Sequence, residues 1–194
     1  MLGLGIGLTI KSKKGGGGIP IIASFDVPSA DYCGFYQEGT GDLTFNSYLG
    51  IGDQGGDGRY FFVSFSNITI PQGSIISAAY ITFVAYLSYS TANCKGIIYL
   101  NDADTSIPPT TTAEYIALDL TDAFVEWPLP DTIDGNSYDT PEIKAVLQEV
   151  IDRVGWASGN TMTVLLKNNN SDTDARRNFT GYAVSPAVLH VEYT

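Results

Sequence analysis

The chain has 194 residues, which suits one domain or one domain plus an arm, and its 10 basic and 21 acidic residues give a net charge of −11. Only 16% of the residues are charged, against about 25% in an average globular protein. Residues 19–194 hold seven basic and 21 acidic residues, so no basic surface for nucleic acid is expected on this part of the chain.

The first eighteen residues have a pattern of their own. Four aliphatic residues alternate with glycines, and three lysines then lead into the run Gly15 to Gly18. Period-two alternation places the aliphatic side chains on one face of an extended strand and bare backbone on the other. We interpret residues 1–18 as a docking arm and tether, and residues 19–194 as the folded domain. The expected docking residues are Leu2, Leu4, Ile6, Leu8, Lys11, Lys13 and Lys14.

Three other interpretations of the arm compete with docking. A secretory signal places its basic residues before the apolar run, whereas here they follow it. A membrane-spanning helix needs about 20 apolar residues, more than this run supplies. A disordered terminus remains an alternative interpretation, although regular aliphatic alternation is unusual in such a segment. We favour an arm that orders against a partner by strand addition or groove filling.

Short β runs separated by turn residues dominate the chain from residue 19 onward. Phe61, Val63 and Phe65 share one face of a run that follows a glycine-rich turn. A longer run spans residues 75–86, with Ala79, Ile81, Phe83 and Ala85 on one face and Tyr80, Thr82, Val84 and Tyr86 on the other. Further strands are predicted at 43–51, 95–101, 114–120, 122–127, 161–167 and 187–193. This pattern predicts an all-β fold, an antiparallel jelly-roll β-sandwich.

One amphipathic helix is predicted at 141–154. Thr140 is placed to cap its amino end, and Pro141 occupies the first helical position. Six apolar residues form a single stripe along it, and Gly155 is expected to end it in a left-handed conformation. The stripe consists of Ile143, Val146, Leu147, Val150, Ile151 and Val154.

Several segments resemble a known group of domains. The run Ile70-Pro-Gln-Gly-Ser-Ile-Ile-Ser-Ala-Ala-Tyr-Ile81 is similar to the "P-x-G-x-x-I-x-x-A-x-L" segment of DNRLRE-type and related carbohydrate-binding jelly rolls. The segment from Thr140 to Asn160 resembles the capping-helix segment "VVQEIVNRPGW-x-SGN" of many bacterial surface and phage proteins, and Pro186 to Tyr193 resembles their "PALLHIEY" ending. The resemblance implies a jelly-roll fold and a carbohydrate-binding, adhesin or virion role. The Gly/Leu leader also resembles the amino ends of small phage structural proteins.

Few residues point to catalysis. His190 is the only histidine and lies on a predicted strand, so we expect it to face solvent rather than to serve a Ser-His-Asp site. Cys33 and Cys94 are too few for a disulfide framework. They form either two small buried side chains or one long-range bridge.

Two kinds of binding site are suggested by side-chain type. Closely spaced carboxylates at Asp102 and Asp104, and at Asp172 and Asp174, offer oxygen ligands for a structural calcium ion, with plain hydrophilic loops as the alternative. Exposed aromatic side chains would stack on a sugar ring, with ordinary packing as the alternative. The candidates for glycan contact are Tyr32, Phe35, Tyr36, Tyr86 and Tyr89.

Taken together, these features favour a non-enzymatic structural protein of a tailed-phage virion, a capsid decoration protein or a head or tail accessory protein. Its arm would bind viral capsid or tail proteins, and a homo-oligomer, with a trimer favoured, is expected. The alternative is a secreted or surface carbohydrate-binding or adhesin module. A small hydrolase is a third class, which no residue specifically supports. Neither a nucleic-acid partner nor a membrane partner is expected.

Overall fold

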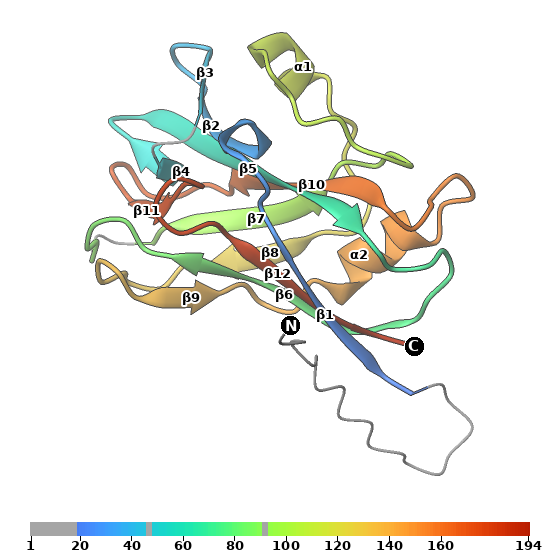
Figure 1. Cartoon of the computed structure of the whole chain (residues 1–194). Helices are drawn as coiled ribbons and strands as arrows, with labels where there is room; N and C mark the ends of the chain where they lie inside the picture. Colours follow the sequence, from blue (N-terminus) through green and yellow to red (C-terminus); the bar gives the residue numbers. More distant parts are fainter. Residues whose placement is uncertain (1–18, 46–47, 91–92) are drawn as a thin grey trace, which may run out of the picture.

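A computed structural model describes residues 19–45, 48–90 and 93–194. Two antiparallel β-sheets pack face to face as a sandwich (Figure 1). The smaller sheet has the strand order β1-β12-β6-β9. Its strands are β1 (Ile21–Asp26), β12 (Val188–Tyr193), β6 (Ile76–Val84) and β9 (Ser137–Asp139). The all-β sandwich predicted from the sequence is confirmed, and the predicted arm lies outside the described residues.

The larger sheet has eight strands, six of them in the order β11-β4-β5-β10-β7-β8, with β2 and β3 joined to it through β5. Their bounds are β2 (Cys33–Gln37), β3 (Asp42–Phe45), β4 (Tyr48–Gln54), β5 (Asp57–Ile68), β7 (Lys95–Leu100), β8 (Val125–Pro128), β10 (Asn160–Asn168) and β11 (Arg176–Thr180). The 12-residue strand β5 pairs with β2, β4 and β10 and so organises this sheet.

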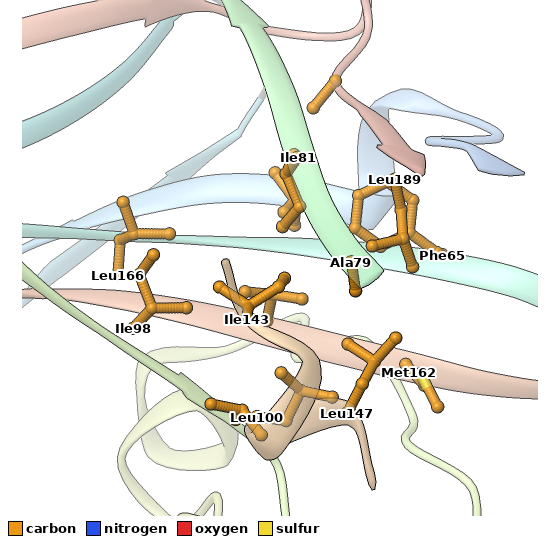
Figure 2. Close-up of a cluster of buried hydrophobic side chains, with 14 of the residues drawn as sticks. Phe65, Ala79, Ile81, Ile98, Leu100, Ile143, Leu147, Met162, Leu166 and Leu189 are labelled. Carbon is orange, nitrogen blue, oxygen red and sulfur yellow. The ribbon is translucent and has the colours of Figure 1, made fainter. Parts of the chain in front are cut away.

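The main core lies between the sheets, where side chains from both inner faces interdigitate with those of a helix (Figure 2). The predicted inward faces are confirmed. Phe61, Val63 and Phe65 of β5 are fully buried, and so are the four predicted residues of the 75–86 run. Trp127 and Trp156 are also buried in this core.

The predicted helix exists but is shorter than expected. Helix α2 spans Lys144–Ile151 and buries four of the six predicted stripe residues, and a fifth, Ile143, is buried just before it. Thr140 does not cap it, because its hydroxyl accepts a hydrogen bond from the backbone N–H of Ile81 in β6. Val154 is 95% exposed, since the helix has already ended. Gly155 is not in a left-handed conformation; a side chain there would instead collide with the Asp104 carboxylate, 1.9 Å from the site of a Cβ atom.

The strand predicted at 114–120 is wrong. Residues Thr112–Ile116 form the short helix α1, because Thr111 and Glu114 make a capping box at its amino end. The spacing Thr-x-x-Glu was present in the sequence, but the apolar residues that follow it favoured a strand. Strands β1, β2, β9 and β11 and the short 3-10 helix η1 (Ala30–Tyr32) were not predicted.

The two cysteines are free and buried, so the bridge considered from the sequence is not formed. Burial raises the pKa of the Cys94 thiol to about 11. Burial also raises the pKa of Cys33.

Candidate functional site

A hollow of about 190 Å³ lies on the outer face of the larger sheet, beside α1. Strands β2, β5 and β10 form its floor, and α1 with the segment that follows it forms one wall. Nine residues line it: Tyr36, Glu38, Tyr60, Tyr115, Ile116, Leu118, Leu120, Leu165 and Lys167. We refer to this feature as the tyrosine hollow.

Strand pairing places the first two tyrosines side by side. Tyr36 of β2 is directly opposite Tyr60 of β5, and their rings stack with centroids 6.0 Å apart. The Tyr60 hydroxyl donates a 2.7 Å hydrogen bond to the carboxylate of Glu38. Gly58 leaves room for this pair, because a Cβ atom there would lie within 2.8 Å of both polar groups. Burial, and then the hydrogen bond to Glu38, raise the pKa of Tyr60.

The third tyrosine comes from α1. The Tyr115 ring lies 5.1 Å from that of Tyr36 and 6.1 Å from that of Phe62. The capping box stabilises α1 itself, and a 2.9 Å hydrogen bond from the Thr112 hydroxyl to the Gly41 carbonyl in the β2–β3 turn anchors it to the sheet. The sheet therefore positions Tyr36 and Tyr60, while a separately anchored helix positions Tyr115 against them.

The hydroxyl of Tyr115 is buried and has no hydrogen-bond partner. The whole residue is only 5% exposed, and burial raises the pKa of its hydroxyl. A buried polar group without a partner is unusual, because it loses its hydrogen bonds to water without replacing them. This unpartnered group belongs to a residue that lines the hollow.

A second apolar cluster supports the floor of the hollow. Phe62, Leu165 and Tyr115 are buried together on the side of the sheet that faces away from the main core. Phe62 also packs edge-on against Phe45 of β3. This packing gives β5 two buried faces, which explains why Phe61 and Phe62 are both fully buried.

The hollow combines features suited to a small polyhydroxylated ligand. The lining is mostly apolar and suits C–H groups, whereas the Glu38 carboxylate and the Lys167 ammonium can bond to ligand hydroxyls. Its volume is below the roughly 300–1,000 Å³ of pockets that enclose drug-sized molecules. It would therefore hold one ring or a chain end. Glu38 is the only carboxylate among the described residues that line it.

The structure separates the five aromatic residues predicted to contact glycan. Only Tyr36 lines the tyrosine hollow. Phe35 points into the main core and stacks on Tyr48 at 4.9 Å, and Tyr32 packs against the same core. Alternation along β2 explains why Phe35 and Tyr36 differ, because successive side chains point to opposite faces of a sheet.

Tyr86 and Tyr89 belong to a different part of the molecule. The Tyr86 ring stacks on that of Tyr48, with centroids 5.8 Å apart. The Tyr89 hydroxyl accepts a 2.8 Å hydrogen bond from the Asn178 amide, and the Arg176 guanidinium lies 5.3 Å from the centre of its ring. These two tyrosines are thus engaged in packing and polar contacts at the β4–β11 side of the larger sheet.

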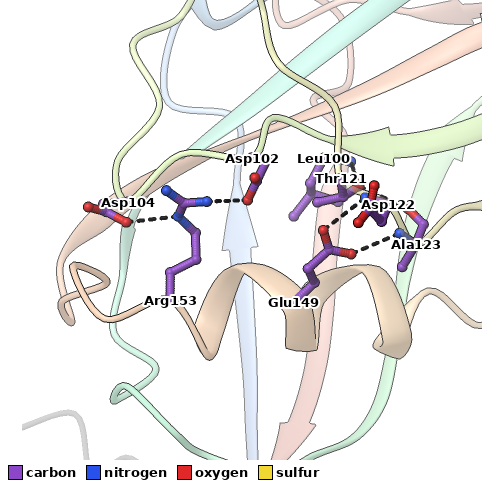
Figure 3. Close-up of polar contacts among 8 residues, drawn as sticks. All are labelled: Leu100, Asp102, Asp104, Thr121, Asp122, Ala123, Glu149 and Arg153. Atoms are coloured by element: carbon purple, nitrogen blue, oxygen red, sulfur yellow. Dashed lines mark hydrogen bonds and ion pairs between the residues drawn. The ribbon is translucent and has the colours of Figure 1, made fainter.

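The carboxylates predicted to bind calcium have protein partners. Asp102 and Asp104 both bind the guanidinium of Arg153, which follows α2 (Figure 3). Asp172 accepts a hydrogen bond from the Asn93 side chain, and Asp174 accepts one from the backbone N–H of Gly55. Arg153 thus takes the position expected for a cation between Asp102 and Asp104. Within residues 19–45, 48–90 and 93–194, no group of three or more His, Cys, Asp or Glu side chains could hold a metal ion.

His190 lies on the outer face of the smaller sheet. Its ring stacks on that of Tyr80 with centroids 4.7 Å apart, and its Nδ1 lies 3.1 Å from the Ser24 hydroxyl. In the part of the chain that the structure describes, no hydrogen bond links this histidine to a carboxylate.

Sequence reasoning missed Tyr60, Tyr115, Glu38 and Lys167. Two signals were available: Tyr60 alternates with the inward residue Phe61, and Tyr115 directly follows the capping-box residue Glu114. Neither signal says that β2, β5 and α1 meet, because that depends on long-range pairing.

No protein-family model matches this sequence, and no curated protein matches it either. Among the described residues, none of the helices is both long enough and apolar enough to span a membrane.

Proposed function

We propose that this chain is a non-enzymatic glycan-binding protein whose tyrosine hollow receives a sugar ring. The observation that carries the proposal is the unpartnered Tyr115 hydroxyl beside the stacked Tyr36 and Tyr60. Sugar recognition uses aromatic side chains together with hydrogen-bonding groups, and both kinds of group line the hollow. Glycoside cleavage commonly needs two carboxylates, and of the described lining residues only Glu38 is one.

A glycan array probed with the labelled full chain tests this function. Three proteins are compared: wild type, Tyr36→Ala, and Tyr80→Ala as a control. Tyr80 is a 38% exposed tyrosine on the other sheet, so it matches the residue type without touching the hollow. We expect wild type and Tyr80→Ala to bind the same glycans, and Tyr36→Ala to lose affinity about tenfold or more. The proposal would be contradicted if wild type bound no glycan on the array, or if Tyr36→Ala bound as tightly as wild type.

A second candidate function is that of a virion accessory protein of a tailed phage, a decoration protein or a related head or tail component. One structural observation favours it: β1, which begins three residues after residue 18, lies at an edge of the smaller sheet. An arm that leaves the body at a sheet edge is well placed to reach a neighbouring surface. The two functions are compatible, since a particle-bound domain can also present a sugar site.

Deleting residues 1–18 tests particle attachment. The truncated protein should remain folded, because its core lies within residues 19–194, but should no longer co-sediment with the particle. Truncated protein that joins the particle at wild-type occupancy would show that the contact lies on the sandwich itself.

A further inference from the structure

We infer that the open edge of β1 is an acceptor site for the chain's own segment Leu2–Leu8, which pairs with it as an added antiparallel strand. This inference does not depend on the glycan-binding proposal. It is an alternative to particle attachment through the arm, because Leu2–Leu8 cannot pair with β1 and reach a neighbouring surface at the same time. Segment Leu2–Leu8 lies outside the described residues, and the geometry of β1 and the sequence of the arm point to this pairing.

Strand β1 uses only half of its backbone groups within the described residues, where it pairs with β12 alone. The N–H of Val27, just past the strand, donates to the carbonyl of Ala187. Because bonding alternates along an antiparallel pair, Ala23 and Phe25 also face β12. The N–H and C=O groups of Ile22, Ser24 and Asp26 therefore point to the open edge.

The other side of this sheet shows how the fold closes an edge. Beyond the short strand β9, the free donors of β6 are taken by side chains from α2 and the segment before it. Ile76 donates to Gln148, Ala79 to Glu142 and Ile81 to Thr140, at 2.8, 2.7 and 3.0 Å. No comparable cover lies on β1 among the described residues. An uncovered edge is a ready template for another strand.

The side chains around this edge fit the alternating arm. Ile21, Ala23 and Phe25 share the inner face of β1; Ile21 is 48% exposed, and Ala23 and Phe25 are only partly buried. An added strand with its aliphatic side chains turned inward would cover this flank of the core, leaving its glycines outside. The lengths agree as well, because Leu2–Leu8 would extend about 24 Å and six-residue β1 about 20 Å.

Connectivity and charge select the chain's own arm as the occupant. The arm precedes β1 in sequence and is joined to it through Gly15–Gly18, so it can turn back as a long hairpin. Such tethering supplies an effective concentration of about millimolar. Pairing β1 with β1 of a second copy would instead bring together two bodies that each carry −14, whereas the arm carries three lysines.

Residue-resolved amide hydrogen exchange of the full chain, compared with the chain lacking residues 1–18, tests the inference. We expect the amides of Ile22, Ser24 and Asp26 to exchange about tenfold or more slowly in the full chain. The amides of Ala23 and Phe25 serve as internal controls, because β12 protects them in both proteins.

Two full-length variants separate strand pairing from charge. Leu4→Asp should speed exchange at the three edge amides, while Ser12→Asp, with the same charge change in the tether, should not. Protection must also occur in a protein that light scattering shows to be a monomer. Equal exchange in the full and truncated chains overturns the inference, and protection seen only in an oligomer assigns the edge to a neighbouring copy's arm instead.

Discussion

Replacing Tyr115 with Phe should stabilise the ligand-free protein. The variant keeps the ring, and with it the contacts to Tyr36 and Phe62 at 5.1 and 6.1 Å, while it removes a buried hydroxyl that has no partner. A buried, unsatisfied polar group costs about 1–3 kcal/mol, so the free energy of unfolding should rise by up to that amount. Because the same hydroxyl is proposed to bond the sugar, affinity for glycan should fall in this variant.

Urea unfolding followed by circular dichroism measures the effect, with Tyr60→Phe as the matched control. That variant loses the 2.7 Å hydrogen bond to Glu38. Its stability should therefore fall, by about 0.5–1.5 kcal/mol because the pair is partly solvated. The two changes remove one hydroxyl each and should have opposite signs. A loss of 1 kcal/mol or more in Tyr115→Phe would refute the reasoning, since it would mean that the hydroxyl has a partner.

Three further predictions concern the body of the fold. Leu147→Ala removes a fully buried side chain of α2 and should lower the free energy of unfolding by about 2–5 kcal/mol. The control Val154→Ala, at a 95% exposed position, should change it by less than about 0.5 kcal/mol. Equal effects of the two variants in denaturant titrations would contradict the packing of α2. Gly155→Ala should cost about 1 kcal/mol or less in the same assay. Its Cβ atom would fall 1.9 Å from the Asp104 carboxylate, which must turn away and weaken its ion pair with Arg153. A gain in stability would argue against this contact. The pKa of Cys94 rises on folding from 9.0 to about 11, so the thiol ionises first in the unfolded state, and the free energy of unfolding should fall as pH rises through that interval. The Cys94→Ala variant should show a smaller fall over the same pH range. A pH profile identical to that of wild type would be inconsistent with burial of a neutral thiol.

Local patterns identified the elements whose side chains follow one clear period. The inward faces of β5 and β6 and the apolar stripe of α2 were predictable, because burial on one side imposes periods of 2 and 3.6. The ends of α2 were not predictable. Thr140 has the residue type of a helix cap, but its hydroxyl instead accepts a hydrogen bond from the Ile81 N–H of β6, which only the tertiary structure reveals.

The candidate site was predictable only through Tyr36. Phe35 and Tyr36 look equivalent in sequence, yet they occupy opposite faces of β2. Similarly, Asp102 and Asp104 have the spacing of cation ligands, but Arg153, some fifty residues later in the chain, supplies the positive charge. In both cases the outcome depends on a partner that is distant in sequence, so local composition could not indicate it.

The most direct measurement of the central claim is an NMR titration of the ¹⁵N-labelled full chain with the glycan that binds best on the array. We predict that the shifted backbone amides cluster around the tyrosine hollow, at Tyr36, Tyr60, Ile116 and Lys167, and that amides around His190 on the other sheet do not move. Shifts that map to the smaller sheet, or no saturable shifts, would contradict the assignment of the tyrosine hollow as a sugar-binding site.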